Sequence, residues 1–203
     1  MTASPAYQRF LASTVMDYEK WHDGVGYDLA ALDEMGQSER DGAEKLMLNR
    51  SLEWREIEVL EKLGSARGWN AIREVFDDNR SIATRLSAAE ALERGGKLDI
   101  AMDRVVAETV REIRDIGEGS TRALLLAEQH PSEQVKRALL EAAGRKSEIA
   151  MHCAALLCYL SGKAKEAFDW ELRPLFLRLV PGNELSDREL AYRELCALVE
   201  MTP

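Results

Sequence analysis

The side chains of this sequence that could perform chemistry are three histidines, three cysteines and many carboxylates. The histidines are His22, His130 and His152, and no His-x-x-x-His or Cys-x-x-Cys spacing gathers metal ligands. Cys153 follows His152, but neighbours on a helix point about 100° apart, which does not favour a nucleophile paired with a base. The sequence therefore predicts no metal site and no thiol nucleophile.

Loops that bind phosphate or carry a serine nucleophile are also missing from the sequence. Gly24-x-Gly26 has no predicted strand before it, Gly117-x-Gly119 has no lysine after it, and Gly-x-Ser-x-Gly does not occur. We interpret both glycine pairs as turns, because glycines break helical periodicity. We predict no catalytic residues, no cofactor and no enzymatic activity.

Carboxylates are the most abundant of the candidate groups. Asp77 and Asp78 are adjacent, and paired acids can perform acid–base catalysis if burial raises the pKa of one of them. They stand before Asn79 at a predicted helix end, where capping is the simpler explanation.

A second interpretation of the acids is a binding surface for a protein partner. The candidates lie on the predicted second helices of two helix pairs, and they are Glu74, Asp77, Asp78, Asp103, Glu108, Glu112 and Asp115. If these helices line one side of the fold, the acids form a groove for a basic surface. The alternative is an ordinary solvated face, because Arg104, Arg111 and Arg114 are interleaved with the acids.

The elements that must position these residues are helices. Ala, Leu, Glu and Arg are abundant, only five residues are proline and 6% are aromatic. These are good helix formers, and β-branched runs bounded by turn signals are absent. The sequence predicts an all-α protein.

A repeat indicates how the helices are organised. Glu58–Gly64 has the sequence EVLEKLG, and Glu90–Gly96, 32 residues later, has EALERGG. A recurrence of this length is one helix–turn–helix unit of a stacked array, and such a unit buries its apolar side only against its neighbours. Trp54 and Trp69 share helical spacing with Ile57 and Ile72, so we expect both rings in the core; exposed, they would be interface hot spots.

Local signals predict several helix ends. Pro5 and the apolar spacing after it predict a first helix to about Trp21, and Asp28 is the predicted cap of a short helix. Ser147 is predicted to cap the most apolar helix, and Ser186 with Glu189 forms a capping box.

The formal net charge of -9 restricts the partners. A protein that binds nucleic acid must neutralise phosphates with clustered lysine and arginine, which this sequence does not have. An acidic surface suits solubility and a basic protein partner. We predict no nucleic acid as a ligand.

The sequence also bears on location. No basic and apolar leader opens it, and its longest apolar run, Met151–Leu160, is too short to span a bilayer. The odd number of cysteines in apolar helical stretches suggests reduced, buried thiols. We expect a cytoplasmic protein with no membrane contact.

Residues 81–113 resemble a HEAT-type repeat. Ile82–Leu92 is similar to the first helix of bacterial HEAT-like repeats, which carry an arginine followed by an Ala-Ala-x-Ala-Leu run, and Leu98 to Ile113 corresponds to the second helix. The resemblance is fair for 53–78 and 147–180 and poor for 118–146. It implies a right-handed α-solenoid of stacked antiparallel helix hairpins, with about 9–11 helices. We expect 1–50 to be an N-terminal helical cap and 51–203 the repeat region, within one compact unit.

HEAT-like repeats imply a scaffold or binding protein. Size, acidity and layout also resemble the helical-repeat immunity proteins of bacterial polymorphic-toxin systems, which implies binding and occlusion of a cognate toxin. Some enzymes share the fold, so the alternatives are a bilin lyase, a nucleic-acid glycosylase or a regulatory scaffold. We expect a non-enzymatic protein-binding module.

Overall fold

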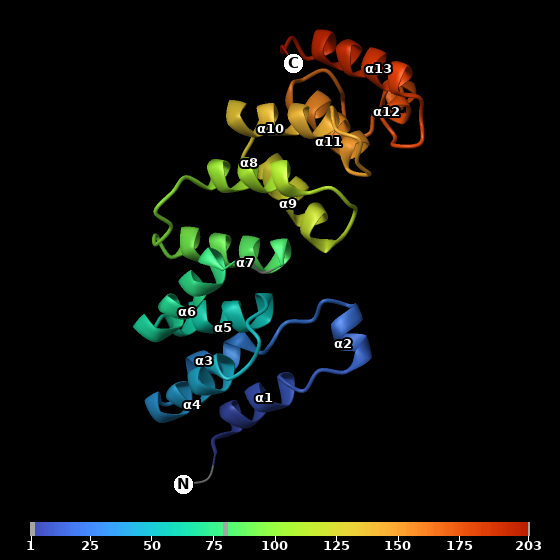
Figure 1. Ribbon diagram of the computed structural model, residues 1–203. Coiled ribbons are helices and arrows are strands. Elements are labelled where there is room, and N and C mark those ends of the chain that lie inside the picture. Colours follow the sequence, from blue (N-terminus) through green and yellow to red (C-terminus); the bar gives the residue numbers. More distant parts are fainter. Residues whose placement is uncertain (1–2, 79–80, 203) are drawn as a thin grey trace. The chain divides into compact units, whose positions relative to one another are not determined.

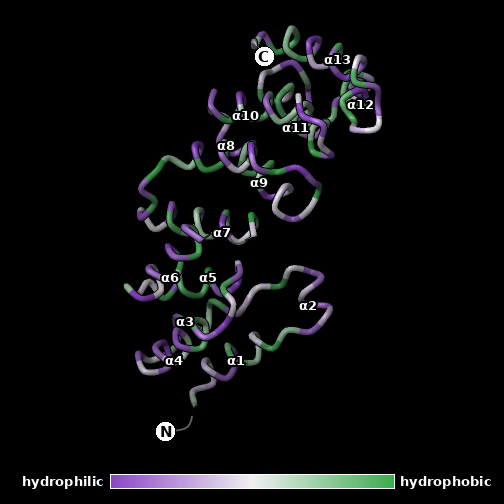
Figure 2. Tube along the Cα trace, in the orientation of Figure 1, coloured by the Kyte–Doolittle hydropathy of each residue, from purple (hydrophilic) through white to green (hydrophobic). Residues whose placement is uncertain are grey.

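The computed structural model describes residues 3–78 and 81–202 (Figure 1). Over these residues the chain forms thirteen α-helices and no strand, so the all-α prediction is confirmed. Within that part of the chain, no helix combines the length and apolarity that crossing a bilayer requires. In Figure 2 hydrophilic and hydrophobic residues alternate along the helices, as expected where one side of a helix is buried.

The chain divides into two compact units, Met1–Leu98 and Asp99–Pro203. The expected boundary between residues 50 and 51 falls inside the first unit. The helices of the first unit are α1 (Pro5–Ser13), α2 (Tyr18–His22), α3 (Leu29–Glu34), α4 (Gln37–Leu48), α5 (Trp54–Leu63), α6 (Ala66–Asp77) and α7 (Ile82–Arg94). Those of the second are α8 (Met102–Glu112), α9 (Glu118–Gln129), α10 (Glu133–Ala143), α11 (Ala150–Leu160), α12 (Arg173–Arg178) and α13 (Leu185–Leu198).

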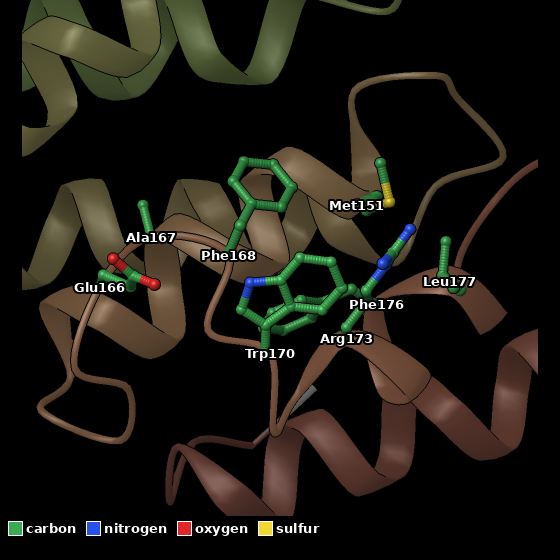
Figure 3. Close-up of a pocket in the computed structure, with 8 residues that line it drawn as sticks. All are labelled: Met151, Glu166, Ala167, Phe168, Trp170, Arg173, Phe176 and Leu177. Atoms are coloured by element: carbon green, nitrogen blue, oxygen red, sulfur yellow. The ribbon is translucent and has the colours of Figure 1, made fainter.

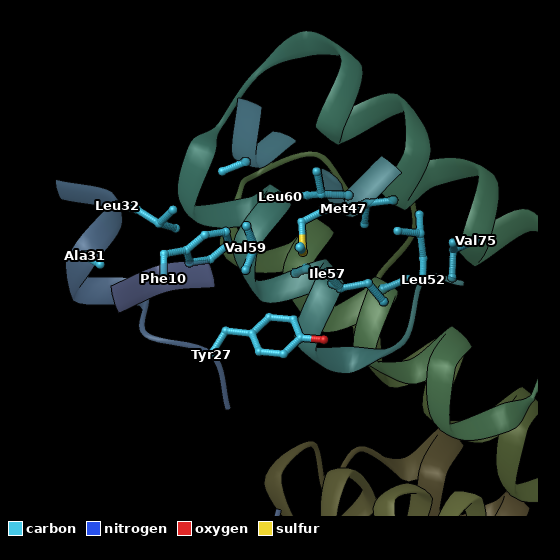
Figure 4. Packing of buried hydrophobic residues seen from close by; sticks show 14 of the residues in the cluster. Phe10, Tyr27, Ala31, Leu32, Met47, Leu52, Ile57, Val59, Leu60 and Val75 are labelled. Carbon is cyan, nitrogen blue, oxygen red and sulfur yellow. The ribbon is translucent and has the colours of Figure 1, made fainter. Parts of the chain in front are cut away.

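One apolar core holds the first unit together (Figure 4). It takes the fully buried side chains of Phe10 from α1, Leu32 from α3, Met47 from α4, Leu60 from α5 and Ile72 from α6. Burial of each such side chain stabilises the fold by roughly 1.5–3 kcal/mol. Residues 5–48 therefore share a core with α5 and α6 rather than forming a separate domain.

Hydrogen bonds between polar side chains connect the loops of the first unit to α5. The buried carboxylate of Glu56 accepts a hydrogen bond from the Tyr27 hydroxyl (2.6 Å), which in turn accepts one from Arg50 (3.1 Å). Burial and the Glu56 carboxylate raise the pKa of Tyr27 to about 12. Arg50 also donates to the Thr14 carbonyl (3.4 Å), so the segment after α1 is fixed against α5.

The expected first helix is in fact two helices, and that prediction was wrong between Thr14 and Asp17. The Thr14 hydroxyl donates to the Leu11 carbonyl (2.9 Å), and the Asp17 carboxylate accepts from the Lys20 amide (2.9 Å). Side chains of these types compete with the helical backbone and stop or start helices. This break is one reason why the helices outnumber the expected nine to eleven.

Other expected helix ends were correct. Asp28 accepts from the Ala31 amide (3.0 Å) and caps α3. Gly64 ends α5 at φ +70°, a conformation that glycine adopts without strain. The cap of α7 is Ser81, which accepts from the Thr84 amide (3.2 Å), and Asn79 lies outside the described residues.

The second unit packs around α11, where Cys153, Ala154, Leu157 and Cys158 are fully buried. The predicted Ser147 cap was wrong: α11 begins after Ile149, and the Ser147 hydroxyl has no hydrogen-bond partner among the described residues.

The helix α13 starts two residues earlier than the Ser186–Glu189 capping box predicted. The Arg178 guanidinium of α12 donates to the Asp187 carboxylate (2.9 Å), which fixes this first turn against α12.

Candidate functional site

The seven candidate partner-binding carboxylates lie in two groups, one on each unit. Glu74 and Asp77 are exposed in the last turn of α6, and Asp78 is the exposed residue that follows. These three are therefore neighbours on the surface of the first unit. Their role in binding a partner stays a prediction.

The other four carboxylates do not share one face of α8. Asp103 and Glu112 are nine positions apart, which places them on opposite sides of a helix. Glu108 is paired with Arg104 (2.9 Å), and Asp115 follows the helix end. These four carboxylates therefore do not form one continuous acidic face on α8.

Among the described residues, His152 shares α11 with Cys153 and Cys158, whereas His22 and His130 lie elsewhere. No cluster of three or more His, Cys, Asp or Glu side chains that could hold a metal occurs within 3–78 and 81–202. His22 contacts its neighbour Asp23 (3.0 Å) on the surface, and His130 follows α9. Burial raises the pKa of Cys153 and of Cys158 to about 12, so both thiols are protonated near neutral pH.

Large apolar side chains are exposed on α2 and in the segments next to it. We call this group the α2 surface, and it consists of Val15, Tyr18, Trp21 and Val25, which are exposed by 67%, 74%, 62% and 45%. The Tyr18 ring lies 6.4 Å from the Trp21 ring. Large apolar side chains gathered in this way on a surface mark interaction sites more often than isolated ones do.

A buried arginine binds the backbone of the α2 surface. Arg55, only 6% exposed, donates from Nε to the Val25 carbonyl (2.8 Å) and stacks its guanidinium on the Trp54 ring (4.3 Å). The Lys20 ammonium donates to the Val15 carbonyl (3.1 Å), closing the other end of the segment. The exposed rings therefore stand on a fixed backbone. Trp54 and Trp69, expected in the core, are both half-buried.

The charge of the α2 surface is negative. Between Val15 and Val25 the sequence has three carboxylates, Asp17, Glu19 and Asp23, and one lysine, all on exposed or half-buried positions. With histidine neutral, three acids less one base leave a net charge of -2. An apolar patch with an acidic rim complements an apolar patch with a basic rim.

A second candidate lies in the second unit, as a pocket of about 500 Å³ between α11 and α12 (Figure 3). Its walls are mostly aromatic and aliphatic, and its lining residues are Met151, Glu166, Ala167, Phe168, Trp170, Arg173, Phe176 and Leu177. Volume and composition are those of small-molecule sites in proteins. We call it the α11–α12 pocket.

The segment before α12 positions the pocket aromatics. The Asp169 carboxylate accepts from the amides of Lys165 and Glu171 (both 3.0 Å), and these bonds lower its pKa. Phe168 has φ +70°, which is strained for an aromatic residue. Its ring packs edge-on against Phe176, with the ring centres 6.4 Å apart.

Sequence reasoning missed both surfaces. Helical periodicity places Trp21 at the end of a continuous helix and gives no role to Trp170. The signal available in the sequence was aromatic residues where helical periodicity breaks, after Asp17 and before Pro174.

Comparison with known proteins assigns the chain to no family. The chain matches no protein-family model, no curated protein and no solved structure.

Proposed function

We propose that this protein is a non-enzymatic binding module whose α2 surface contacts a protein partner with a basic rim. The observation that carries the proposal is the exposure of Tyr18 and Trp21 on a backbone that Arg55 holds in place. The exposed rings keep apolar surface in contact with water, which is unfavourable. A partner that covers the rings removes this surface from water and so stabilises the complex. Rigid aromatic side chains are also the residues that concentrate interface energy.

The fold part of the proposal is a stack of helix pairs like that of HEAT repeats. In the first unit α1 packs on α3, α3 on α5, α4 on α6 and α5 on α7. In the second unit α8 packs on α10 and α9 on α11. Contact between every second helix is the pattern expected when successive hairpins stack in two layers, and it supports a solenoid arrangement within each unit.

The partner class follows from charge and from the resemblance to immunity proteins. The net charge of -9 and the acidic rim of the α2 surface favour a basic protein, and charge complementarity accelerates encounter. A basic toxin neutralised by occlusion of its active site is such a partner. The mechanism requires only surface coverage and no bond-making step.

The test is recovery of the partner with matched variants. Wild-type protein, the double variant Tyr18→Ser/Trp21→Ser and the control Leu190→Ser, which alters an exposed leucine of α13 (56%), are cross-linked in the native host. We expect a basic protein to be recovered with wild type and with Leu190→Ser but not with the double variant. Binding of the purified pair should weaken as salt rises.

The opposite pattern refutes the proposal. If the double variant, shown to be folded by circular dichroism, recovers the same proteins in the same amounts, the α2 surface does not bind the partner.

A further inference from the structure

We propose that the α11–α12 pocket binds a planar aromatic molecule that carries one carboxylate. The rings of Phe168 and Trp170 hold the aromatic body, and Arg173 holds the carboxylate (Figure 3). This site lies on the second unit, whereas the proposed protein interface is on the first. The two proposals can therefore fail separately.

The size and the walls of the pocket define the body of the ligand. A volume of about 500 Å³ suits a small molecule rather than a helix or a folded loop. Met151, Phe168, Trp170 and Phe176 present thioether and aromatic surface, and aromatic rings stack edge-on or offset against such walls. The preferred body is a flat, apolar ring system.

Arg173 selects the anionic group. Its guanidinium lies 4.5 Å from the centre of the Trp170 ring, and within the described residues it pairs with no carboxylate. In contrast Arg178, one turn and a half further on, pairs with Asp187 and Glu194. Stacking fixes the plane of the Arg173 guanidinium and leaves its N–H groups available, which is the arrangement that recognises a carboxylate through paired hydrogen bonds.

Glu166 limits the charge of the ligand. Figure 3 shows the Glu166 carboxylate and the Arg173 guanidinium on opposite sides of the Phe168 and Trp170 rings. A second anionic group at that end of the ligand would meet Glu166 and be repelled. Ligands with one carboxylate are therefore preferred over dicarboxylates and nucleotides.

Contacts within the protein hold the backbone at Phe168, and with it the pocket wall, in place. A φ of +70° is unfavourable for a phenylalanine, and residues held in this region persist where the surroundings enforce them. Here the two hydrogen bonds to Asp169 and the packing of the ring on His152 (5.0 Å between ring centres) enforce it. The pocket wall is thus shaped before any ligand arrives.

Isothermal titration calorimetry with cinnamate, cinnamamide and hexanoate tests the assignment on the full-length protein. Cinnamamide keeps the shape and removes the charge, and hexanoate keeps the charge and removes the ring. We expect saturable binding of cinnamate, about ten-fold tighter than of either analogue, because a charge-assisted pair is lost in one and the aromatic contact in the other.

Matched variants locate the site. Arg173→Gln should bind cinnamate no better than cinnamamide, and Arg193→Gln, an exposed arginine of α13 that does not line the pocket, should behave as wild type. Trp170→Ala removes a ring that is 71% exposed, so the fold should persist while cinnamate affinity falls. Absence of saturable binding, equal affinity for the three probes, or an unchanged preference in Arg173→Gln overturns the proposal.

Discussion

Replacing Gly95 by alanine should destabilise the first unit through a single steric contact. A Cβ atom at Gly95 would lie 2.5 Å from Trp69 Cη2 and 3.0 Å from both Cζ2 and Cζ3. Carbon atoms in van der Waals contact are about 3.5–4.0 Å apart, so the ring must move by roughly 1 Å. Trp69 packs against the apolar core, and the Lys97 ammonium lies 5.3 Å from its ring centre. The ring cannot move without disturbing these contacts.

Two opposing effects set the change in the free energy of unfolding. Overpacking of this kind costs about 1–3 kcal/mol. The backbone at Gly95, with φ −77° and ψ −2°, is ordinary for alanine, which therefore restricts the unfolded chain and stabilises by about 0.4–1 kcal/mol. We expect a net loss of about 1–2 kcal/mol in the free energy of unfolding, measured by urea denaturation with circular dichroism.

Two controls separate the contact from the backbone. Gly182→Ala, where nothing lies within 4 Å of the added Cβ, should be neutral or slightly stabilising for the second unit. In a Trp69→Leu background the Gly95→Ala change should lose most of its cost, as a double-mutant cycle would show. If Gly95→Ala is as stable as wild type, or if the loss is undiminished in the Trp69→Leu background, the steric argument is wrong.

Four further predictions concern other contacts in the fold. Gly144→Ala should cost about 1–2 kcal/mol in urea denaturation, because its Cβ would lie 2.9 Å from the Tyr192 ring. Tyr27→Phe should cost about 1–3 kcal/mol by the same assay, because it leaves the buried Glu56 carboxylate without its hydroxyl donor; a loss below that range would count against the network. Thiol reagents at about pH 8 should not label Cys153 in the native protein and should label it after unfolding. Its pKa is raised from 9.0 to about 12 on folding, so the protonated thiol contributes stability below pH 9.0 that is lost as pH rises toward 12, seen as a falling unfolding midpoint.

The parts of the fold that the sequence predicted are those fixed by local interactions. Asp28, the predicted cap of a short helix, caps α3 through the amide three residues later. The Ser132 cap of α10, found in the structure, has the same short range (3.3 Å to the Val135 amide). The amides of Gly64 and Gly144 end α5 and α10 by donating to carbonyls four residues earlier, an equally local contact. In each case donor and acceptor lie within one turn, so the sequence contains both partners.

The parts that were not predicted depend on distant residues. The start of α11 is fixed where the Ile149 amide donates to the Arg114 carbonyl (3.4 Å), a contact that no local pattern indicates. The candidate sites have the same origin. Trp21 and Trp69 both lie within helices, yet one is 62% exposed and the other packs against Gly95. Whether a tryptophan ring is buried therefore depends on contacts with residues that are distant in the sequence.

The two surfaces share a physical feature that argues against accidental exposure. A tryptophan in a loose loop would gain by folding back onto its own protein, because burial of the ring removes apolar area from water. Polar side chains restrain the backbone near both rings. Arg55 binds the carbonyl of Val25, four residues after Trp21, and Asp169 accepts from the amides of Lys165 and Glu171 around Trp170. Polar groups that keep aromatic rings exposed lower the stability of the isolated chain, because the rings stay in contact with water. Their effect is favourable only when something else covers the rings, and this is why we place binding at these two surfaces rather than at the dispersed carboxylates of α8.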